Sequence, residues 1–482
     1  MTKCLLGLLA ALFVAGGATA GDSTRYLAFQ IFTGSFDSRP MRQAFPPPPE
    51  DLRHTVRELR ERIGAPAAEG RRIGFVIGPI ALDNPDEEVR GRIAEGFTLA
   101  LETGVAVGFH IDDSMFWGRL RELNTPDNLE WLDWKGTVNT GRRLDWSSKP
   151  LKIMPQLGFN SKGVRKAVAD RAALIGREIG KGVARLRAAH QEDLFLGVIA
   201  GWETQIGRDF DTGKSLGYRA LVNAGYSAAH PPADIDLARS KVVHDFVDFW
   251  ARSLVEAGVP RGKVYSHIAF QSETLYRLVR RAHSSGAAGP YLEAIHFTPP
   301  ATAFCDSCLP GLSTCPQPGL LEQWRAELAK HGNPPWASCE GTALDPAQAE
   351  QGGKGMNMEG YLGNLFNHGA VLVNVFGWGV GGPENPFRKT AESASAVAAY
   401  RKFLRGEKLR EAPIPVPVLP PEGLEAKVHR VQAELPRWVE KHGPAKVKAN
   451  VEKLDRALKE KRFEDAAAAA DAILKTIEKE PR

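Results

Sequence analysis

The strongest constraint on the fold is a repeated unit in which an apolar segment is followed by a polar loop and an amphipathic helix. The unit recurs eight times, and near-continuous apolar strands that alternate with helices are typical of a parallel sheet buried on both faces. The predicted strands are Tyr26–Phe32, Arg72–Ile77, Val105–Ile111, Leu194–Ala200, Val264–Phe270, Ala294–Phe297, Pro335–Cys339 and Val371–Phe376.

Helices predicted between these strands complete the unit. They cover Glu50–Ile63, Glu87–Glu102, Ser161–His190, Asp236–Ala257, Thr274–His283, Leu320–His331, Met356–His368 and Ala391–Arg405. Eight units over roughly 380 residues fit an α/β fold of the (β/α)8 TIM-barrel type. A doubly wound open sheet is the alternative, and it is disfavoured because no Gly-rich phosphate-binding motif follows any strand.

The two ends of the chain fall outside the repeat. Residues 1–20 combine Lys3, an apolar stretch and an Ala-Thr-Ala cleavage site, which predicts a signal peptide and export to the periplasm or the medium. An uncleaved membrane anchor is the alternative. We expect the barrel over 21–410, a Pro-rich linker over 411–423 and, from apolar stripes at helical spacing, a small helical appendage over 424–482.

Composition limits the class of protein. The 482 residues are 43% hydrophobic and 25% charged, which excludes a polytopic membrane protein and a disordered chain. The net charge of +5 is small for this length, so a nucleic-acid partner is not expected. Nothing in the sequence predicts an oligomeric state.

Four cysteines follow the predicted signal peptide: Cys305, Cys308, Cys315 and Cys339. In an exported protein the default expectation is that they form two disulfides, with the connectivity open. A Cys4 zinc site is the alternative, because the first two cysteines have the C-x2-C spacing. We therefore predict paired cysteines and no metal.

In a (β/α)8 barrel the chemistry lies at the carboxyl ends of the strands, and two glutamates stand at such ends. Strand four runs into Gly201-Trp202-Glu203-Thr204, and strand seven ends at Cys339, directly before Glu340. Strands four and seven lie roughly across the mouth of such a barrel. Two carboxylates placed there can flank a glycosidic bond, one as proton donor and the other as nucleophile or base.

On these residues the chain, from Tyr26 to Arg405, resembles the large clan of glycoside hydrolases with a glutamate after strand four and another after strand seven. The β-galactosidase-like and β-amylase-like branches are the most similar. The resemblance implies an exported glycosidase that needs no cofactor, acts on an oligo- or polysaccharide, and uses Glu203 as acid/base and Glu340 as nucleophile. Retention of configuration is favoured, although the β-amylase branch inverts. Trp202 stands where the clan usually has an asparagine.

Other polar and aromatic residues near the same strand ends are predicted to bind sugar. They are His110, Asp112, Asp113 and Trp117 after strand three, Trp202 after strand four, Gln271 and Glu273 after strand five, His296 at strand six, and Asn374 and Trp378 at strand eight. Trp131, Trp134 and Trp146 lie in the same insertion as Trp117, and flat indoles can stack on sugar rings. For each residue, burial in the core or in an ion pair is the structural alternative. The insertions Met115–Phe159 and Thr204–Pro232 are expected to wall a cleft.

Two other functions remain open. A barrel that binds a sugar polymer without cleaving it is supported by Trp202 in place of asparagine. A metal-dependent carbohydrate deacetylase could use Asp112 and Asp113, but the chain has no H-x3-5-H pair to complete the metal site. A serine esterase is unsupported because no G-x-S-x-G motif occurs.

Overall fold

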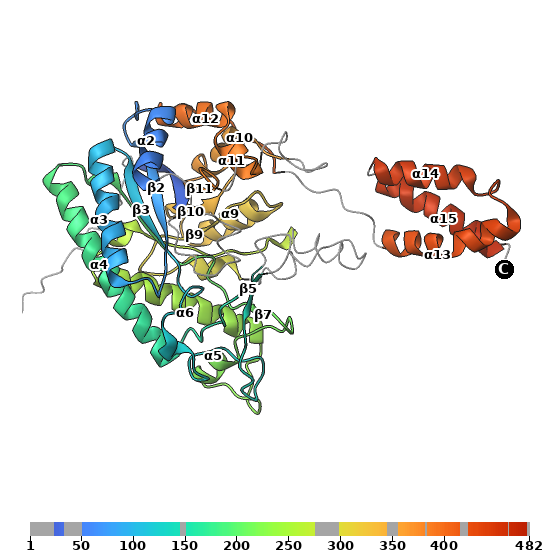
Figure 1. Ribbon diagram of the computed structural model, residues 1–482, viewed down its shortest axis with the longest axis horizontal. Helices are drawn as coiled ribbons and strands as arrows, with labels where there is room; N and C mark the ends of the chain where they lie inside the picture. Colours follow the sequence, from blue (N-terminus) through green and yellow to red (C-terminus); the bar gives the residue numbers. More distant parts are fainter. Residues whose placement is uncertain are drawn as a thin grey trace, which may run out of the picture.

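The central feature of the fold is a closed sheet of eight strands. The computed structural model describes residues 24–32, 51–144, 151–274, 298–344, 355–380, 383–414, 423–460 and 462–479. The strands are β1 (Arg25–Phe32), β2 (Arg71–Ile80), β3 (Ala106–Ile111), β6 (Phe195–Ala200), β8 (Val264–Ser266), β9 (Gly311–Ser313), β10 (Trp336–Gly341) and β11 (Ala370–Val375). They are hydrogen-bonded in the order β8-β6-β3-β2-β1-β11-β10-β9 (Figure 1). Parallel bridges Tyr265–Leu309 and Ile268–Leu312 join the two edges, which confirms the predicted barrel.

Strand six is the one strand whose position differs from the prediction. The predicted segment Ala294–Phe297 lies outside the described residues, and β9 takes the place between β8 and β10. β9 is a three-residue Gly-Leu-Ser segment, too short to show a period-2 pattern. Its Gly311 is required by packing, because a Cβ there would lie 2.3 Å from Ser266 O and 2.5 Å from Cys339 Sγ.

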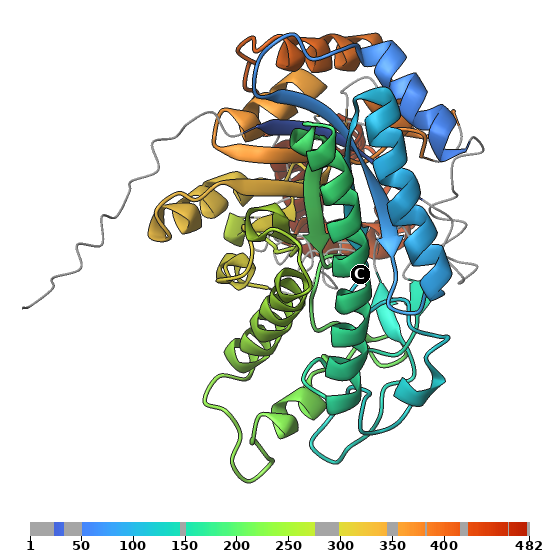
Figure 2. The same ribbon diagram turned by 90° about the vertical axis from the view of Figure 1, so that its left-hand side faces the viewer.

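Helices cover the outer face of the barrel (Figure 2). They are α2 (Leu52–Ile63), α3 (Asp86–Thr103), α4 (Lys162–Ala188), α6 (Ile235–Glu256), α9 (Leu320–Lys330), α10 (Met358–Phe366) and α12 (Ala394–Leu404), with shorter helices η2 (Glu192–Leu194), η3 (Arg261–Lys263), η4 (Pro300–Ala303) and α11 (Pro386–Ala391). Two aspartates fix helix starts: Asp51 accepts from the His54 amide and Asp234 from the Leu237 amide. All but the first residue of the predicted helix Thr274–His283 lies outside the described residues.

The insertions after strands three and four pair with each other. β4 (Arg142–Leu144) and β5 (Leu151–Ile153) from the first insertion form an antiparallel sheet with β7 (Arg208–Asp209) from the second, and short helices η1 (Arg121–Leu123) and α5 (Tyr218–Asn223) complete them. Within this sheet Arg142 lies opposite Asp209. The pairing places a buried arginine, which is only 3% exposed, near the carboxyl ends of the barrel strands.

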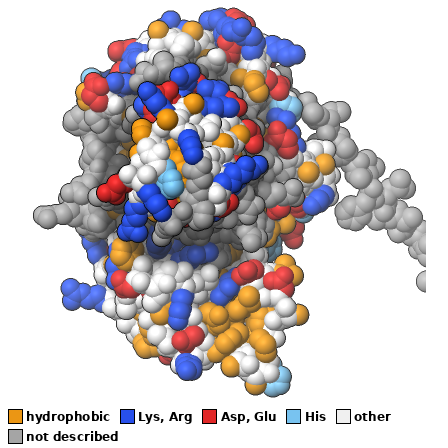
Figure 3. All heavy atoms as spheres, turned by 90° about the vertical axis from the view of Figure 1, so that its right-hand side faces the viewer, with side chains coloured by type: hydrophobic (Ala, Val, Ile, Leu, Met, Phe, Trp, Pro, Cys, Tyr) orange, Lys and Arg blue, Asp and Glu red, His pale blue; other side chains and the backbone are white. Residues whose placement is uncertain are grey.

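Three further helices follow the barrel: α13 (Leu424–His442), α14 (Lys448–Lys459) and α15 (Phe463–Lys479). They have a hydrophobic core of their own, built around residues such as Trp438, Leu454 and Ile473. The predicted C-terminal helices are therefore present. Among the described residues, no helix is long and apolar enough to cross a membrane. On the face drawn in Figure 3, Lys and Arg side chains are interspersed with Asp and Glu.

The cysteines differ from the expectation of two disulfides. Cys305 and Cys308 are bonded to each other, whereas Cys315 and Cys339 are free thiols. Cys339 is buried on β10, with Sγ 3.1 Å from the carbonyl oxygen of Ser266. Cys315 has solvent access beyond the end of β9. The prediction that all four cysteines pair was wrong, because neighbouring strands direct the last two thiols into different surroundings.

We expect thiol titration of the unfolded chain that starts at Gly21 to find two thiols before reduction and four after it. The two accessible without reductant are Cys315 and Cys339. Mass spectrometry after alkylation without reductant should find the label on these two positions only. Label on Cys305 or Cys308 would contradict the observed bond.

Candidate active site

Glu203 stands on a tight turn directly after β6. The backbone of Glu203 has φ 53° and that of Gly201 has φ 110°. A left-handed conformation costs a glutamate on the order of 1 kcal/mol, and such strain persists where the surroundings over-determine it. Thr204 supplies that anchoring: its amide donates to His267 O at 3.1 Å, and its hydroxyl donates to Asp113 Oδ2 at 2.5 Å.

Glu340 lies on β10 and faces the same space as Glu203. The pKa of Glu340 is raised well above its ordinary value, chiefly by burial and next by the Glu203 carboxylate, while the nearby Trp202 indole opposes the shift. Two carboxyl groups that interact in this way titrate as a pair, and both are not ionised together without a large cost. The two carboxyl groups can therefore share one proton, so that one of them is an acid while the other is ionised.

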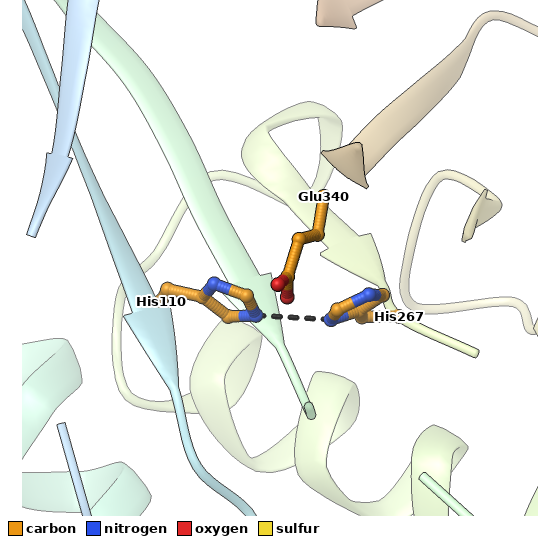
Figure 4. A group of neighbouring side chains, drawn as sticks. All are labelled: His110, His267 and Glu340. Atoms are coloured by element: carbon orange, nitrogen blue, oxygen red, sulfur yellow. Dashed lines mark hydrogen bonds between the residues drawn. The ribbon is translucent and has the colours of Figure 1, made fainter. Parts of the chain in front are cut away.

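Behind Glu340 lie two buried histidines, His110 from the end of β3 and His267 directly after β8. Figure 4 shows the Glu340 carboxylate directed at the gap between their rings. His110 Nε2 lies 2.9 Å from His267 Nδ1, and these nitrogens lie 3.0 and 3.2 Å from Gly201 O. Burial lowers the pKa of His267 to about 3, and burial followed by the His267 charge lowers the pKa of His110 well below 6.5. Both imidazoles are therefore neutral.

The histidines connect the glutamates to other strands. His267 Nε2 lies 2.9 Å from Ser313 Oγ, which lies 2.7 Å from Glu203 Oε1. On the other side, His110 Nδ1 lies 2.9 Å from Gln30 Oε1. Asn374 Nδ2 donates to that oxygen at 2.9 Å and to Cys339 O at 2.8 Å.

Three members of this network, Gln30, His267 and Ser313, were not predicted as site residues. His267 fell within the strand expected over Val264–Phe270, whereas β8 ends at Ser266. Ser313 was missed together with β9. Gln30 carried a usable signal, because it is a polar residue in an otherwise apolar part of β1 and is completely buried.

The two predicted aspartates are buried and already bound by protein groups. Asp112 accepts from the amides of Met115 and Phe116, at 3.1 and 2.9 Å. Asp113 accepts from Thr204. Burial raises the pKa of both, with the neighbouring Asp113 as the second cause for Asp112. The positive charge of Arg142 acts on both aspartates and on Glu203, so this cluster orients the turn that carries Glu203.

Three tryptophans predicted to contact sugar are instead covered by protein. Trp117, Trp202 and Trp378 are 1%, 3% and 2% exposed. Trp202 stacks on His110, with ring centroids 4.4 Å apart, and on Phe32 at 5.8 Å. Trp378 packs on Phe29 with Arg62 over its ring. These packing contacts differ from the predicted sugar platforms, because they leave no indole face open.

The remaining predicted contacts are spread more widely. Gln271 is buried, and Glu273 is exposed with its amide bonded to Gln323. Asn374 is completely buried within the network described above. Trp131 lies beneath the guanidinium of Arg219, and Trp134 packs edge-on against Tyr218. His296 and Trp146 lie outside the described residues.

Cys315, which follows β9, lies close to both glutamates. Its side chain has solvent access. Desolvation, followed by the carboxylates of Glu340 and Glu203, nevertheless raises the pKa of the thiol to about 12. A separate cavity of about 600 Å³ lies away from the glutamates, where Tyr226 and Leu237 are among the lining residues.

One set of described residues could hold a metal ion: His110, His267 and Glu340, whose ligand atoms all lie within 4.8 Å of one another. Two imidazoles and a carboxylate suit zinc and similar transition metals. Asp112 and Asp113, which a deacetylase would use, are not part of this set. The aspartate pair of the deacetylase alternative and the observed histidine pair are thus different groups.

Comparisons with known proteins add weak structural similarity. No family model and no curated protein matches the sequence. Among solved structures, the chain is similar to a GH42 β-galactosidase from G. stearothermophilus, with 11% identity, 82% of this chain and 58% of that chain covered, and a TM-score of 0.40. An exo-β-1,4-mannosidase from Opitutaceae bacterium strain TAV5 is 13% identical, with 80% of this chain and 60% of that chain covered and a TM-score of 0.39. A glycoside hydrolase family 5 enzyme from Prevotella bryantii B14 is 8% identical, with 80% of this chain and 95% of that chain covered and a TM-score of 0.36. At these TM-scores the similarity does not carry an argument about activity, and the barrel rests on its own strand order.

Replacing Arg142 by Met should lower the free energy of unfolding by about 3 kcal/mol, because removing one member of a buried charge cluster leaves the others uncompensated. Asp113, Asp112 and Glu203 lose their shared cation. Urea denaturation at neutral pH measures the change. Arg143→Met is the matched control, since Arg143 is the next residue of β4 and only half-buried. Equal losses of unfolding free energy in the two variants would show that the charge cluster around Arg142 does not stabilise the fold more than an ordinary surface arginine does.

Proposed function

We propose that the protein is an exported glycoside hydrolase that cleaves an O-glycosidic bond with Glu203 as acid/base and Glu340 as nucleophile. The observation that carries the proposal is the electrostatic coupling of these two carboxyl groups at the ends of β6 and β10. A pair that holds one proton supplies an acid and an anion at the same place, which is what cleavage of a glycosidic bond requires.

The raised pKa of Glu340 draws the shared proton toward that residue in the free protein, so the proposed reaction requires the proton to be on Glu203 once substrate is bound. Ionised Glu340 then attacks the anomeric carbon while protonated Glu203 donates its proton to the departing oxygen. A covalent glycosyl-enzyme results, and a water molecule then hydrolyses it with Glu203 acting as base. The strained turn at Glu203 supports this role, because Thr204 anchors the backbone next to it and Ser313 Oγ lies 2.7 Å from its carboxyl oxygen. Preorganisation of this kind lowers the cost of reaching the reactive geometry.

The substrate class we infer is an oligo- or polysaccharide, in keeping with the resemblance to clan glycosidases. The paired insertions carry β4, β5 and β7, and Arg142 on β4 lies close enough to Glu203 to interact with its charge. We expect the loops of these insertions to contact the sugar. Export to the periplasm or the medium remains part of the proposal, on the strength of residues 1–20.

Glu203→Gln and Glu340→Gln should each lower kcat at least about a hundredfold on any cleaved glycoside, because each variant removes a group that transfers a proton or forms a covalent bond. A glycan-panel screen of the unaltered protein identifies the substrate first. Thr302→Ser serves as the control, since Thr302 is a buried residue of η4 outside the site. Near-normal turnover by either Gln variant would remove that glutamate from the mechanism.

Hydrolysis should proceed with retention of the anomeric configuration if Glu340 is a nucleophile. Proton NMR of the first product formed from an aryl glycoside distinguishes the two anomers before mutarotation. Azide should also restore activity to Glu340→Ala on an activated substrate and give the glycosyl azide of inverted configuration. If the unaltered enzyme releases a product of inverted configuration, Glu340 is instead a base that activates water.

A metal-dependent hydrolase is the second candidate, favoured by the close approach of His110, His267 and Glu340. It predicts that dialysis against a chelator abolishes turnover and that zinc restores it, whereas the glycosidase proposal predicts full activity after chelation. The third candidate is a sugar-binding barrel without turnover. It predicts glycan binding that Glu203→Gln leaves intact and no hydrolysis by the unaltered chain.

A further inference from the structure

The small antiparallel sheet formed by the two insertions is rich in positive charge. Its strands β4, β5 and β7 contain four cations, Arg142, Arg143, Lys152 and Arg208, and a single acid, Asp209. Over the whole chain, in contrast, 62 Lys and Arg residues are nearly balanced by 57 Asp and Glu residues. The sheet therefore differs in charge from the average of the molecule.

The strand register places three of these cations side by side. Arg143 on β4 is the partner of Lys152 on β5 and of Arg208 on β7. Residues paired in this way share one face of the sheet, with Cβ atoms about 5 Å apart, and like charges in such positions are destabilising. We call Lys152, Arg143 and Arg208 the cationic row. Its repulsion is relieved when anions lie against this face.

The acids near the row are bonded to other groups or to one end of it. Asp209 follows Arg208 on β7 and so lies on the opposite face, where its Oδ2 accepts from the amide and the hydroxyl of Thr212 at 2.9 and 2.8 Å. Asp211 accepts from Lys152 Nζ at 2.6 Å. Neither acid is bonded to Arg208, and the part of the chain that the structure describes gives this arginine no ion pair.

Arg208 also has an unsatisfied donor. The side chain is half-buried, and its Nε is a buried atom without a hydrogen-bond partner among the described residues. A buried donor without a partner is costly, and a guanidinium can satisfy Nε and a terminal nitrogen together by donating two parallel hydrogen bonds to one carboxylate. A planar anion therefore fits Arg208 better than a neutral hydroxyl group does.

The cationic row lies near the glutamate pair. Arg142, which precedes Arg143 on β4, is buried on the other face of the sheet, and its charge acts on Glu203. Arg208 begins β7, shortly after the turn that carries Glu203. A polymer bound at Glu203 extends well beyond the bond that is cleaved, so its next sugar units can reach the row.

We propose that the substrate is an acidic polysaccharide containing uronic acid units, and that the cationic row binds its carboxylates with Arg208 as the main contact. This inference rests on the proposed function and deepens it by naming the substrate class. A neutral glycan would leave the adjacent cations and the Arg208 Nε uncompensated, whereas carboxylates compensate both. The spacing of about 5 Å between paired cations is similar to the length of one sugar unit, so neighbouring cations can meet neighbouring units.

The direct test is binding, which does not depend on turnover. The full chain with Glu340→Gln is titrated at low salt with oligomers of polygalacturonate, alginate and hyaluronan, and with the carboxyl-reduced form of each. At least one acidic oligomer should bind about tenfold more tightly than its reduced form, and added salt should weaken only the acidic one. Equal affinities for each pair, or no binding by any of the acidic oligomers, would overturn the proposal.

Variants of the row assign the binding to named residues. Arg208→Gln should lower the affinity for the acidic oligomer about tenfold, and Arg208→Lys should restore only part of it, because an ammonium cannot donate the two parallel bonds. Arg187→Gln is the matched control, since Arg187 lies on α4 and is exposed. Thermal unfolding followed by circular dichroism checks that each variant is folded. Unchanged affinity in folded Arg208→Gln, or an equal loss in Arg187→Gln, would remove the row from substrate binding.

Other polyanions test whether the row recognises carboxylates on sugars or negative charge in general. Dextran sulfate and single-stranded DNA are titrated at the same ionic strength as the acidic oligomers. We expect both to bind several-fold more weakly than the best acidic oligomer. Binding of either one with equal or higher affinity would make the row a general polyanion surface and would refute the assignment to uronic acids.

These measurements separate the inference from the proposed function. If the unaltered protein cleaves neutral glycans and binds no acidic oligomer, the glycosidase stands and the inference fails. If acidic oligomers bind through Arg208 but no glycoside is cleaved, the binding row stands and Glu203 and Glu340 lose their catalytic roles.

Discussion

The interior of the barrel mouth is governed by one requirement: a polar group removed from water needs a hydrogen-bond partner, and the partner has to come from another strand. Six side chains from β1, β11 and the ends of β3, β6, β8 and β9 are linked in this way, although Gln30 Nε2 and Asn374 Oδ1 have no hydrogen-bond partner among the described residues. Cys339 O provides the fixed acceptor, and Glu203 lies at the other end. Closure of the sheet is therefore a condition for the site as well as for the core, since opening it between β8 and β9 would separate His267 from Ser313.

Glycines inside the barrel make room for this arrangement. A Cβ at Gly108 would lie 2.2 Å from Leu196 Cδ1, and one at Gly74 would lie 2.6 Å from Leu196 Cδ2. The side chain of Leu196 thus fills the space that Gly74 on β2 and Gly108 on β3 leave empty. Near the site, a Cβ at Gly78 would meet His110 Cβ at 2.8 Å and Gln30 Nε2 at 2.9 Å. The missing Cβ of Gly78 on β2 leaves room for Gln30 on β1 to reach across to His110 on β3.

The sequence predicted the barrel well because its strands are long and apolar, and buried parallel strands such as β3 and β6 leave that pattern intact. The two glutamates were predicted from the strand ends, and the structure has Glu203 on the turn after β6 and Glu340 within β10. It did not predict β9, because three small residues carry no periodic signal, and the network lost Ser313 for the same reason. Two disulfides among the four cysteines were expected from compartment alone, whereas the surroundings of Cys315 and Cys339, one exposed and one buried, depend on strands that are adjacent only after closure.

Trp202 shows how a departure from the expected pattern can fit the same chemistry. An asparagine at this position would present a small polar group, whereas the indole stacks on His110 and Phe32 and is nearly inaccessible to water. Its bulk helps to exclude water from behind Glu340, and its N–H still interacts with that carboxylate. The exclusion of water by this indole strengthens the electrostatic effect of each carboxyl group on the other, because the local dielectric constant falls. The same exclusion of water makes a charged imidazolium more costly in the histidine pair, so the indole and the burial of His110 and His267 both favour neutral rings behind the carboxyl groups.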